Sequence, residues 1–225
     1  MTKICPLSVL AVGSLLVAAC SHGPKHPSPE DMIGADPLPL ALGASWSYKA
    51  TVSQFDPDTK QDVKKEYEWT TSVVAAHPIQ DVTSFTLKGW PSDLVNGFEG
   101  TAAPTPGEKT ILRQGDTFLW ADKADTVEGA MGWFTWPLMD GQQICPDPRV
   151  SYCWVVATTE DGYRLTYRTG PDEETYLLQP GTGIAEYTYQ HHGTTLEVHA
   201  KLTDYHEGKK GAMSPEGAPT TPSGQ

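Results

Sequence analysis

The sequence has few basic residues and, after residue 20, no long hydrophobic run. Its 16 Lys and Arg residues against 28 Asp and Glu residues give a formal net charge of −12. Phosphate binding depends on clustered Lys and Arg, so we expect no nucleic-acid partner. No segment after Cys20 approaches the roughly 18 apolar residues of a transmembrane helix, so we expect no membrane-spanning helix there.

Catalytic and phosphate-binding motifs are also missing. The segment Gly43–Ser47 departs from the nucleophile motif G-x-S-x-G at its fifth position. The glycines at Gly181 and Gly183 lead into a predicted strand, whereas a phosphate cradle needs a helix at that point. We therefore expect a non-enzymatic protein without a cofactor, with an unrecognised hydrolase as the alternative.

The first twenty residues have the features of an export signal. Lys3 precedes an uncharged run from Ile4 to Ala18, and small residues follow. The segment Val17-Ala18-Ala19-Cys20 resembles the bacterial lipobox, in which the chain is cut before the cysteine and the cysteine is acylated. The resemblance implies a lipoprotein signal peptide over 1–19 and a membrane anchor on Cys20. The alternative is an ordinary signal peptide followed by a chance cysteine.

The residue after Cys20 bears on which membrane holds the protein. The retention signal of inner-membrane lipoproteins has Asp at this position, and this chain has Ser21. The resemblance therefore implies an outer-membrane lipoprotein that faces the periplasm or the cell surface. The acidic chain has no basic patch for anionic lipid, so attachment would rest on the acyl chains.

Two cysteines, Cys145 and Cys153, lie outside the signal segment. An even pair in a chain exported to an oxidising compartment favours a disulfide. A metal or redox pair would need closer spacing, such as C-x-x-C, or further ligands nearby. We therefore predict a Cys145–Cys153 disulfide.

Aromatic residues mark the limits of the folded part. Every Trp, Tyr and Phe lies between Trp46 and Tyr205, and aromatic side chains dominate core burial. The flanking segments are rich in Pro and Gly, which is typical of disordered chain. We predict a disordered tether over 20–37, one domain over 38–207 and a disordered tail over 208–225.

Within the domain the hydrophobic pattern has a period of two. Trp46, Tyr48, Ala50 and Val52 alternate with polar residues, which indicates a half-buried strand. The segment from Tyr67 to Val73 repeats the pattern, and glycine-containing turns separate further apolar runs. The predicted fold is all-β, a single antiparallel domain. The pattern leaves open a curled sheet, a sandwich or an open barrel.

Two segments resemble a group of bacterial envelope lipoproteins with an all-β domain. The opening segment is Pro37-Leu38-Pro39-Leu40-Ala41-Leu42-Gly43-Ala44-Ser45-Trp46-Ser47-Tyr48. The closing segment runs from Gly181 through Tyr187 to the turn His191–Thr194. The resemblance implies an envelope address and a β fold, but no reaction.

Histidines and acids are the candidates for a metal site. His191 and His192 lie at the last predicted turn, and His199 follows on the next strand. Imidazoles bind zinc and copper, but adjacent strand residues point to opposite faces, which argues against a shared metal. We expect no metal site. The acidic run Asp172–Glu174 is interpreted as a solvated turn, with a cation site as the alternative.

The domain has more aromatic residues than a small β core needs. If the segment around Trp133 is extended, its rings cannot all point inward. The residues in excess of the core are Trp90, Trp120, Trp133, Phe134 and Trp136. The pattern leaves open a second core layer under a long loop, a partner surface and the mouth of an apolar cavity.

These observations favour two functions. The first is a membrane-anchored envelope lipoprotein that binds another envelope protein or has a structural role. The second is a carrier whose curled sheet holds a lipid or an acyl chain. The sequence does not indicate an oligomeric state.

Overall fold

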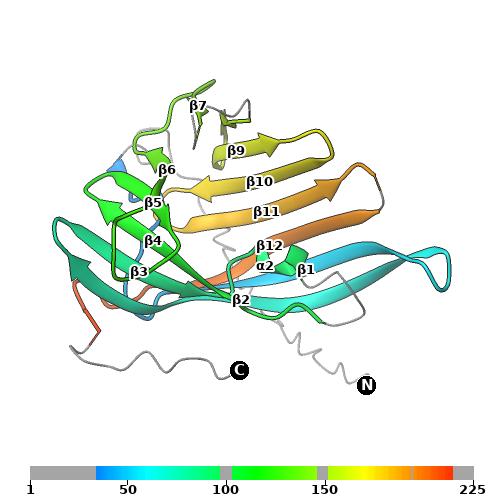
Figure 1. Ribbon diagram of the computed structural model, residues 1–225, viewed down its shortest axis with the longest axis horizontal. Coiled ribbons are helices and arrows are strands. Elements are labelled where there is room, and N and C mark those ends of the chain that lie inside the picture. The colour runs from blue at the N-terminus through cyan, green and yellow to red at the C-terminus, as the bar shows by residue number, and fades with distance from the viewer. Residues whose placement is uncertain (1–33, 97–102, 146–151, 194, 215–225) are drawn as a thin grey trace, which may run out of the picture.

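The computed structural model describes residues 34–96, 103–145, 152–193 and 195–214 (Figure 1). They form one antiparallel sheet of twelve strands in the order β6-β5-β4-β3-β2-β1-β12-β11-β10-β9-β8-β7. A four-residue helix, α2, follows β3. The elements are β1 (Ser45–Asp56), β2 (Gln61–Ile79), β3 (Val82–Lys88), α2 (Asp93–Asn96), β4 (Glu108–Gln114), β5 (Thr117–Ala121), β6 (Met131–Thr135), β7 (Gln143–Ile144), β8 (Trp154–Thr159), β9 (Gly162–Arg168), β10 (Asp172–Gln179), β11 (Gly183–His191) and β12 (Leu196–His206).

The sheet curls until its two edge strands approach each other, so it forms a nearly closed barrel (Figure 1). The short segment between β6 and β7 connects the two edges directly. Within it, the Trp136 ring packs edge-on against Tyr163 of β9 at 5.1 Å between centroids. The all-β prediction is confirmed, and of the three architectures left open the sandwich is excluded because there is one continuous sheet.

The predicted alternation is confirmed where it is clearest. Trp46, Tyr48, Ala50 and Val52 are all buried on the inner face of β1. On β2, Trp69 and Val73 are buried in the same core. β1 pairs with both β2 and β12, so it joins the first six strands to the last six.

The segment before β1 crosses one end of the curled sheet. The Asp36 carboxylate forms an ion pair with Arg113 at 2.5 Å, near the end of β4. Its carbonyl accepts a hydrogen bond from the Gly181 amide in the β10–β11 turn. Leu38 is only 1% exposed. Residues 34–37, which the sequence assigned to the tether, therefore pack with the domain.

The start of the predicted tail is docked as well. Lys209 pairs with Leu42 as an isolated β-bridge. The Ser214 amide donates to the Ala76 carbonyl at 2.7 Å, and its hydroxyl accepts from the Ala76 amide at 3.0 Å. Part of the segment that the sequence assigned to the tail, 208–214, is therefore held against the domain by hydrogen bonds. Residues 215–225 lie outside the described residues, as do the predicted signal peptide over 1–19 and the predicted lipidation site Cys20.

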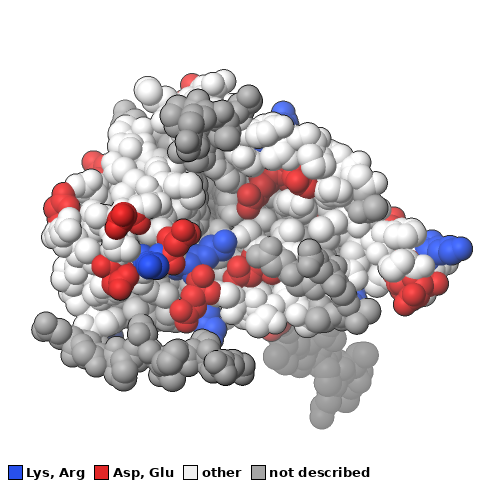
Figure 2. Space-filling model, in the orientation of Figure 1, with Lys and Arg blue, Asp and Glu red and all other residues white. Residues whose placement is uncertain are grey.

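The surface carries charges of both signs. On the face shown in Figure 2, Lys and Arg side chains lie next to Asp and Glu side chains. Both signs gather at the tip of the long β1–β2 hairpin, at the right of the view. No helix among the described residues has the length and hydropathy needed to cross a membrane.

The predicted disulfide between Cys145 and Cys153 is confirmed. It links the residue after β7 to the residue before β8, and so holds the edge strand β7 onto the sheet.

We expect Cys153→Ala to lower the free energy of unfolding by about 2.5 kcal/mol under oxidising conditions, because the bridge removes conformational entropy from the unfolded chain. Thermal melts with and without reductant measure this. Reductant should lower the melting temperature of the wild type and leave the variant unchanged. Equal melting of reduced and oxidised wild type would contradict the prediction.

Candidate functional site

A pocket of about 730 Å³ opens at one end of the curled sheet. It lies at the start of β4, β6 and β8, near the start of β10 and at the end of β5. Arg113 and the β10–β11 turn, which contact the segment before β1, lie at the opposite ends of β4 and β10. The pocket therefore opens away from the end crossed by that segment. Its lining residues are Val74, Ala75, Thr86, Trp90, Ser92, Glu108, Lys109, Thr110, Trp120, Ala121, Asp122, Ala124, Met131, Trp154, Glu174 and Tyr176.

Aromatic rings at varied angles form much of the pocket wall. Trp90 meets Trp120 nearly at right angles, with 5.0 Å between ring centroids. Trp154 is tilted by 47° against Tyr176 at 5.4 Å. Trp133 packs behind them, 5.7 Å from Trp90 and 4.6 Å from Trp120. Such contacts add to the stabilisation that area burial gives and hold the walls rigid.

A carboxyl group, Glu174, lies among these rings. The Tyr176 hydroxyl donates to its Oε1 at 2.7 Å and accepts from the Trp90 indole nitrogen at 3.0 Å. The Tyr187 hydroxyl also hydrogen-bonds to Glu174. Burial raises the pKa of Glu174 above its ordinary value, and the two phenols and Lys109 partly offset this rise. Glu174 is partly buried as a whole residue and is one of the residues that line the pocket.

Lys109 carries the positive charge of the pocket. It lies on β4, opposite Leu87 of β3, and interacts electrostatically with Glu174 and with Asp93. Asp93 accepts the Gly107 amide at 2.9 Å, and burial raises its pKa. No ion pair within 4.0 Å joins Lys109 to a carboxylate of the described chain. The Lys109 ammonium therefore acts on the Glu174 carboxyl through its charge and not through a close ion pair.

The position of Trp90 is set by the preceding glycine. Gly89 has φ of +75°, and a Cβ placed there would lie 2.3 Å from the Thr70 carbonyl oxygen. Its own carbonyl accepts hydrogen bonds from the Trp69 indole at 2.8 Å and the Thr71 hydroxyl at 2.6 Å. Only glycine fits this combination of backbone angle and close approach.

We expect Gly89→Ala to lower the free energy of unfolding by roughly 2–5 kcal/mol, since left-handed strain and a backbone clash add together. Gly115→Ala is the matched control: φ there is +56° and nothing lies within 4 Å. It should cost only about 1–2 kcal/mol, the strain alone. Urea unfolding of both variants measures the difference, and equal losses would contradict the role of the clash.

The five excess aromatic residues do not form an exposed surface patch. Trp90 and Trp133 are each 1% exposed and Phe134 is 3% exposed, while Trp120 and Trp136 are partly buried. Neighbouring residues of a regular strand point to opposite faces, yet Trp133 and Phe134 are both buried. A register shift at Phe118/Leu119 interrupts the β5–β6 ladder, so Phe134 stacks on Phe118 while Trp133 joins the indole cluster. Trp90 and Trp120 line the pocket, and Trp136 lies at the other end.

The candidate histidines are placed apart. His191 contacts Asp172 at 2.7 Å, and His199 contacts Glu186 at 2.7 Å. The His192 amide donates to the Pro171 carbonyl. Within the described ranges, no three His, Cys, Asp or Glu residues are grouped as metal ligands.

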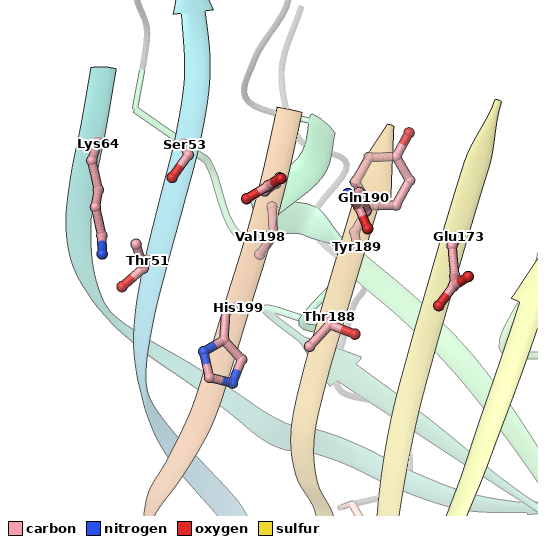
Figure 3. A pocket seen from close by; sticks show the side chains of 10 residues that line it. Thr51, Ser53, Lys64, Glu173, Thr188, Tyr189, Gln190, Val198 and His199 are labelled. Atoms are coloured by element: carbon pink, nitrogen blue, oxygen red, sulfur yellow. The ribbon is translucent and has the colours of Figure 1, made fainter. Parts of the chain in front are cut away.

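A second, smaller groove lies on the outer face of the sheet (Figure 3). On β1, the groove residues Thr51 and Ser53 alternate with the buried residues Ala50 and Val52. Most side chains that line the groove have hydroxyl, amide or charged groups. It has a volume of about 350 Å³ and lacks the indole walls of the pocket. It is lined by Thr51, Ser53, Lys64, Glu173, Thr188, Tyr189, Gln190, Glu197, Val198 and His199.

Glu174 is a site residue that its sequence context did not indicate. The acidic run Asp172–Glu174 is not a solvated turn but the start of β10. Glu173 lies on the outer face, where it pairs with Arg168 at 2.5 Å, and Glu174 lies on the inner face with Tyr176. The period-two signal was present, because Glu174, Tyr176 and Leu178 share one parity.

Comparisons with known proteins do not identify a function for this pocket. No protein-family model matches the chain, and no curated protein is significantly similar to it. Two similar solved structures are those of a protein described as exported, with a YmcC-like fold, from Bacteroides fragilis, and of a protein described as a lipoprotein from Parabacteroides distasonis. Each is 10% identical over 76% of this chain and 99% of the other chain, with a TM-score of 0.39. At this level of similarity we transfer neither function nor site residues.

Proposed function

We propose that this protein is a lipid-anchored lipoprotein of the bacterial envelope that binds a small amphipathic ligand in the pocket at the open end of its curled sheet. One observation carries the binding role: Trp90, Trp120, Trp154 and Tyr176 surround a cavity that also exposes Glu174. Ligand sites are concave, mainly apolar and equipped with a few polar groups, and this pocket has that composition.

The orientation of the aromatic side chains favours the binding of a small ligand over the binding of a protein partner. A partner surface would expose several large rings. Here the indoles are buried or face the pocket, and Trp120 is the partly exposed wall. The expected protein-binding role thus loses the residues on which it was based, and the carrier role, which was the alternative, becomes the first proposal.

The anchor in this proposal is the acylated Cys20. The residues Val17–Cys20 support it, and Ser21 favours the outer membrane, with the domain facing the periplasm or the cell surface. The anchored segment enters the domain at Asp36, at the end opposite the pocket.

The test is to identify what the pocket holds. We expect the whole chain with Cys20→Ala, purified without detergent, to carry a small molecule that native mass spectrometry detects at one per chain. Trp120→Ala should lose it, because the variant removes a pocket wall. The control is Phe55→Ala, which changes a ring that is 43% exposed near the end of β1.

Two results together would overturn the binding role. One is wild-type protein that carries no small molecule. The other is the absence of any binding of single-chain amphiphiles, such as octyl glucoside below its micelle concentration, in calorimetric titration.

A further inference from the structure

We propose that the ligand has a positively charged group, an ammonium or quaternary ammonium, that sits between the indole rings and the Glu174 carboxylate. This inference rests on the proposed function and adds the charge class of the ligand. It is carried by the ring geometry, the position of the acid and the charge balance of the lining.

The ring geometry fits a cation. Indole faces attract cations within about 6 Å of the ring centre, and aromatic cages are a common way to recognise quaternary ammonium groups. Trp90 and Trp120 are nearly perpendicular, and Trp154 and Tyr176 are tilted against each other. Rings set at such angles line a pocket on several sides, whereas parallel rings would leave a flat slot suited to a planar ligand.

The acid is held in place by the core. Two phenols donate to Glu174, and Tyr176 is in turn oriented by the Trp90 indole. A carboxylate has about four acceptor positions, so these two donors leave capacity for a ligand. The burial that raises the pKa of Glu174 would be offset by an entering cation, because an opposite charge nearby favours the ionised carboxylate.

The charged side chains that line the pocket also favour a cationic ligand. Glu108, Asp122 and Glu174 line the pocket against Lys109 alone. Three carboxylates against one ammonium leave an excess of negative charge, which favours a cationic group and disfavours an anionic one.

The test compares three amphiphiles with the same octyl chain, each titrated below its micelle concentration into the whole chain with Cys20→Ala. The probes are octyltrimethylammonium, octyl glucoside and octyl sulfate, which differ in headgroup charge. We expect the ammonium probe to bind most tightly. Glu174→Gln should weaken its binding roughly tenfold to a hundredfold, because the variant removes the coulombic attraction between the carboxylate and the trimethylammonium group, and should weaken octyl glucoside binding far less.

Glu173→Gln is the matched control, because Glu173 is the neighbour of Glu174 on the outer face of β10. It should change the binding of no probe. If the three probes bind equally and Glu174→Gln has no effect, the charge inference fails while the proposed function stands. Tightest binding of octyl sulfate would also overturn the inference, since Lys109 would then dominate. If no probe binds, the proposed function fails with it.

Discussion

Replacing Cys20 by alanine should move the protein from the membrane pellet to the soluble fraction. Each buried methylene of an acyl chain contributes about 0.8 kcal/mol to membrane binding, and two or more chains together make a stable anchor. We expect the loss of membrane association to be nearly complete, because the variant cannot carry the acyl chains.

The control for this experiment is Cys5→Ala, which changes a cysteine within the predicted signal peptide and should leave the protein membrane-bound. Fractionation followed by mass spectrometry of the amino-terminal peptide measures both localisation and acylation. Membrane retention of the Cys20→Ala protein, or an unmodified Cys20 in the wild type, would refute the lipid anchor.

Trp133→Ala should lower the free energy of unfolding by about 3–5 kcal/mol, the range for removing a large aromatic side chain from a core. Trp133 is fully buried and contacts Trp90, Trp120, Phe134 and Tyr176. Its loss would leave a cavity behind the pocket wall, because one rigid sheet surrounds it. For a domain of this size the melting temperature should fall by roughly 10 °C.

Trp133→Phe separates ring packing from polar effects. The Trp133 indole nitrogen is buried without a hydrogen-bond partner in the described part of the chain, and a buried unsatisfied donor destabilises the folded state. Phenylalanine removes that donor while keeping an aromatic ring, so we expect a change within about 1.5 kcal/mol of the wild type. An alanine variant that melts like the wild type would contradict the core role of this residue.

The positions of the strands were predictable where one face of the sheet is buried and the other is exposed to solvent. The alternation from Trp46 to Val52 is an example, and the hairpin of β11 and β12 is another. The curl of the sheet was not predictable, because it depends on which edges meet and not on the pattern within a strand. The inward position of both Trp133 and Phe134 was missed for a similar reason, since a register shift does not change the local composition.

The site was harder to predict than the fold. Glu174 lies in an acidic run, where composition indicates a solvated turn and outweighs the strand period. The docked segments around Asp36 and Ser214 are held by an ion pair and by backbone hydrogen bonds. Such contacts leave no hydrophobic pattern, so the sequence did not indicate them.

The pairing of β1 with β12 has a consequence for the order of folding. Strands β1–β6 and β7–β12 each pair only with their neighbours along the chain, so each half can form through local hairpins. Ser45 must meet His206 to join the halves, and contacts so distant in sequence are slow to form. The join between β1 and β12 should therefore be a late event, and two fragments cut between β6 and β7 should reassemble through it.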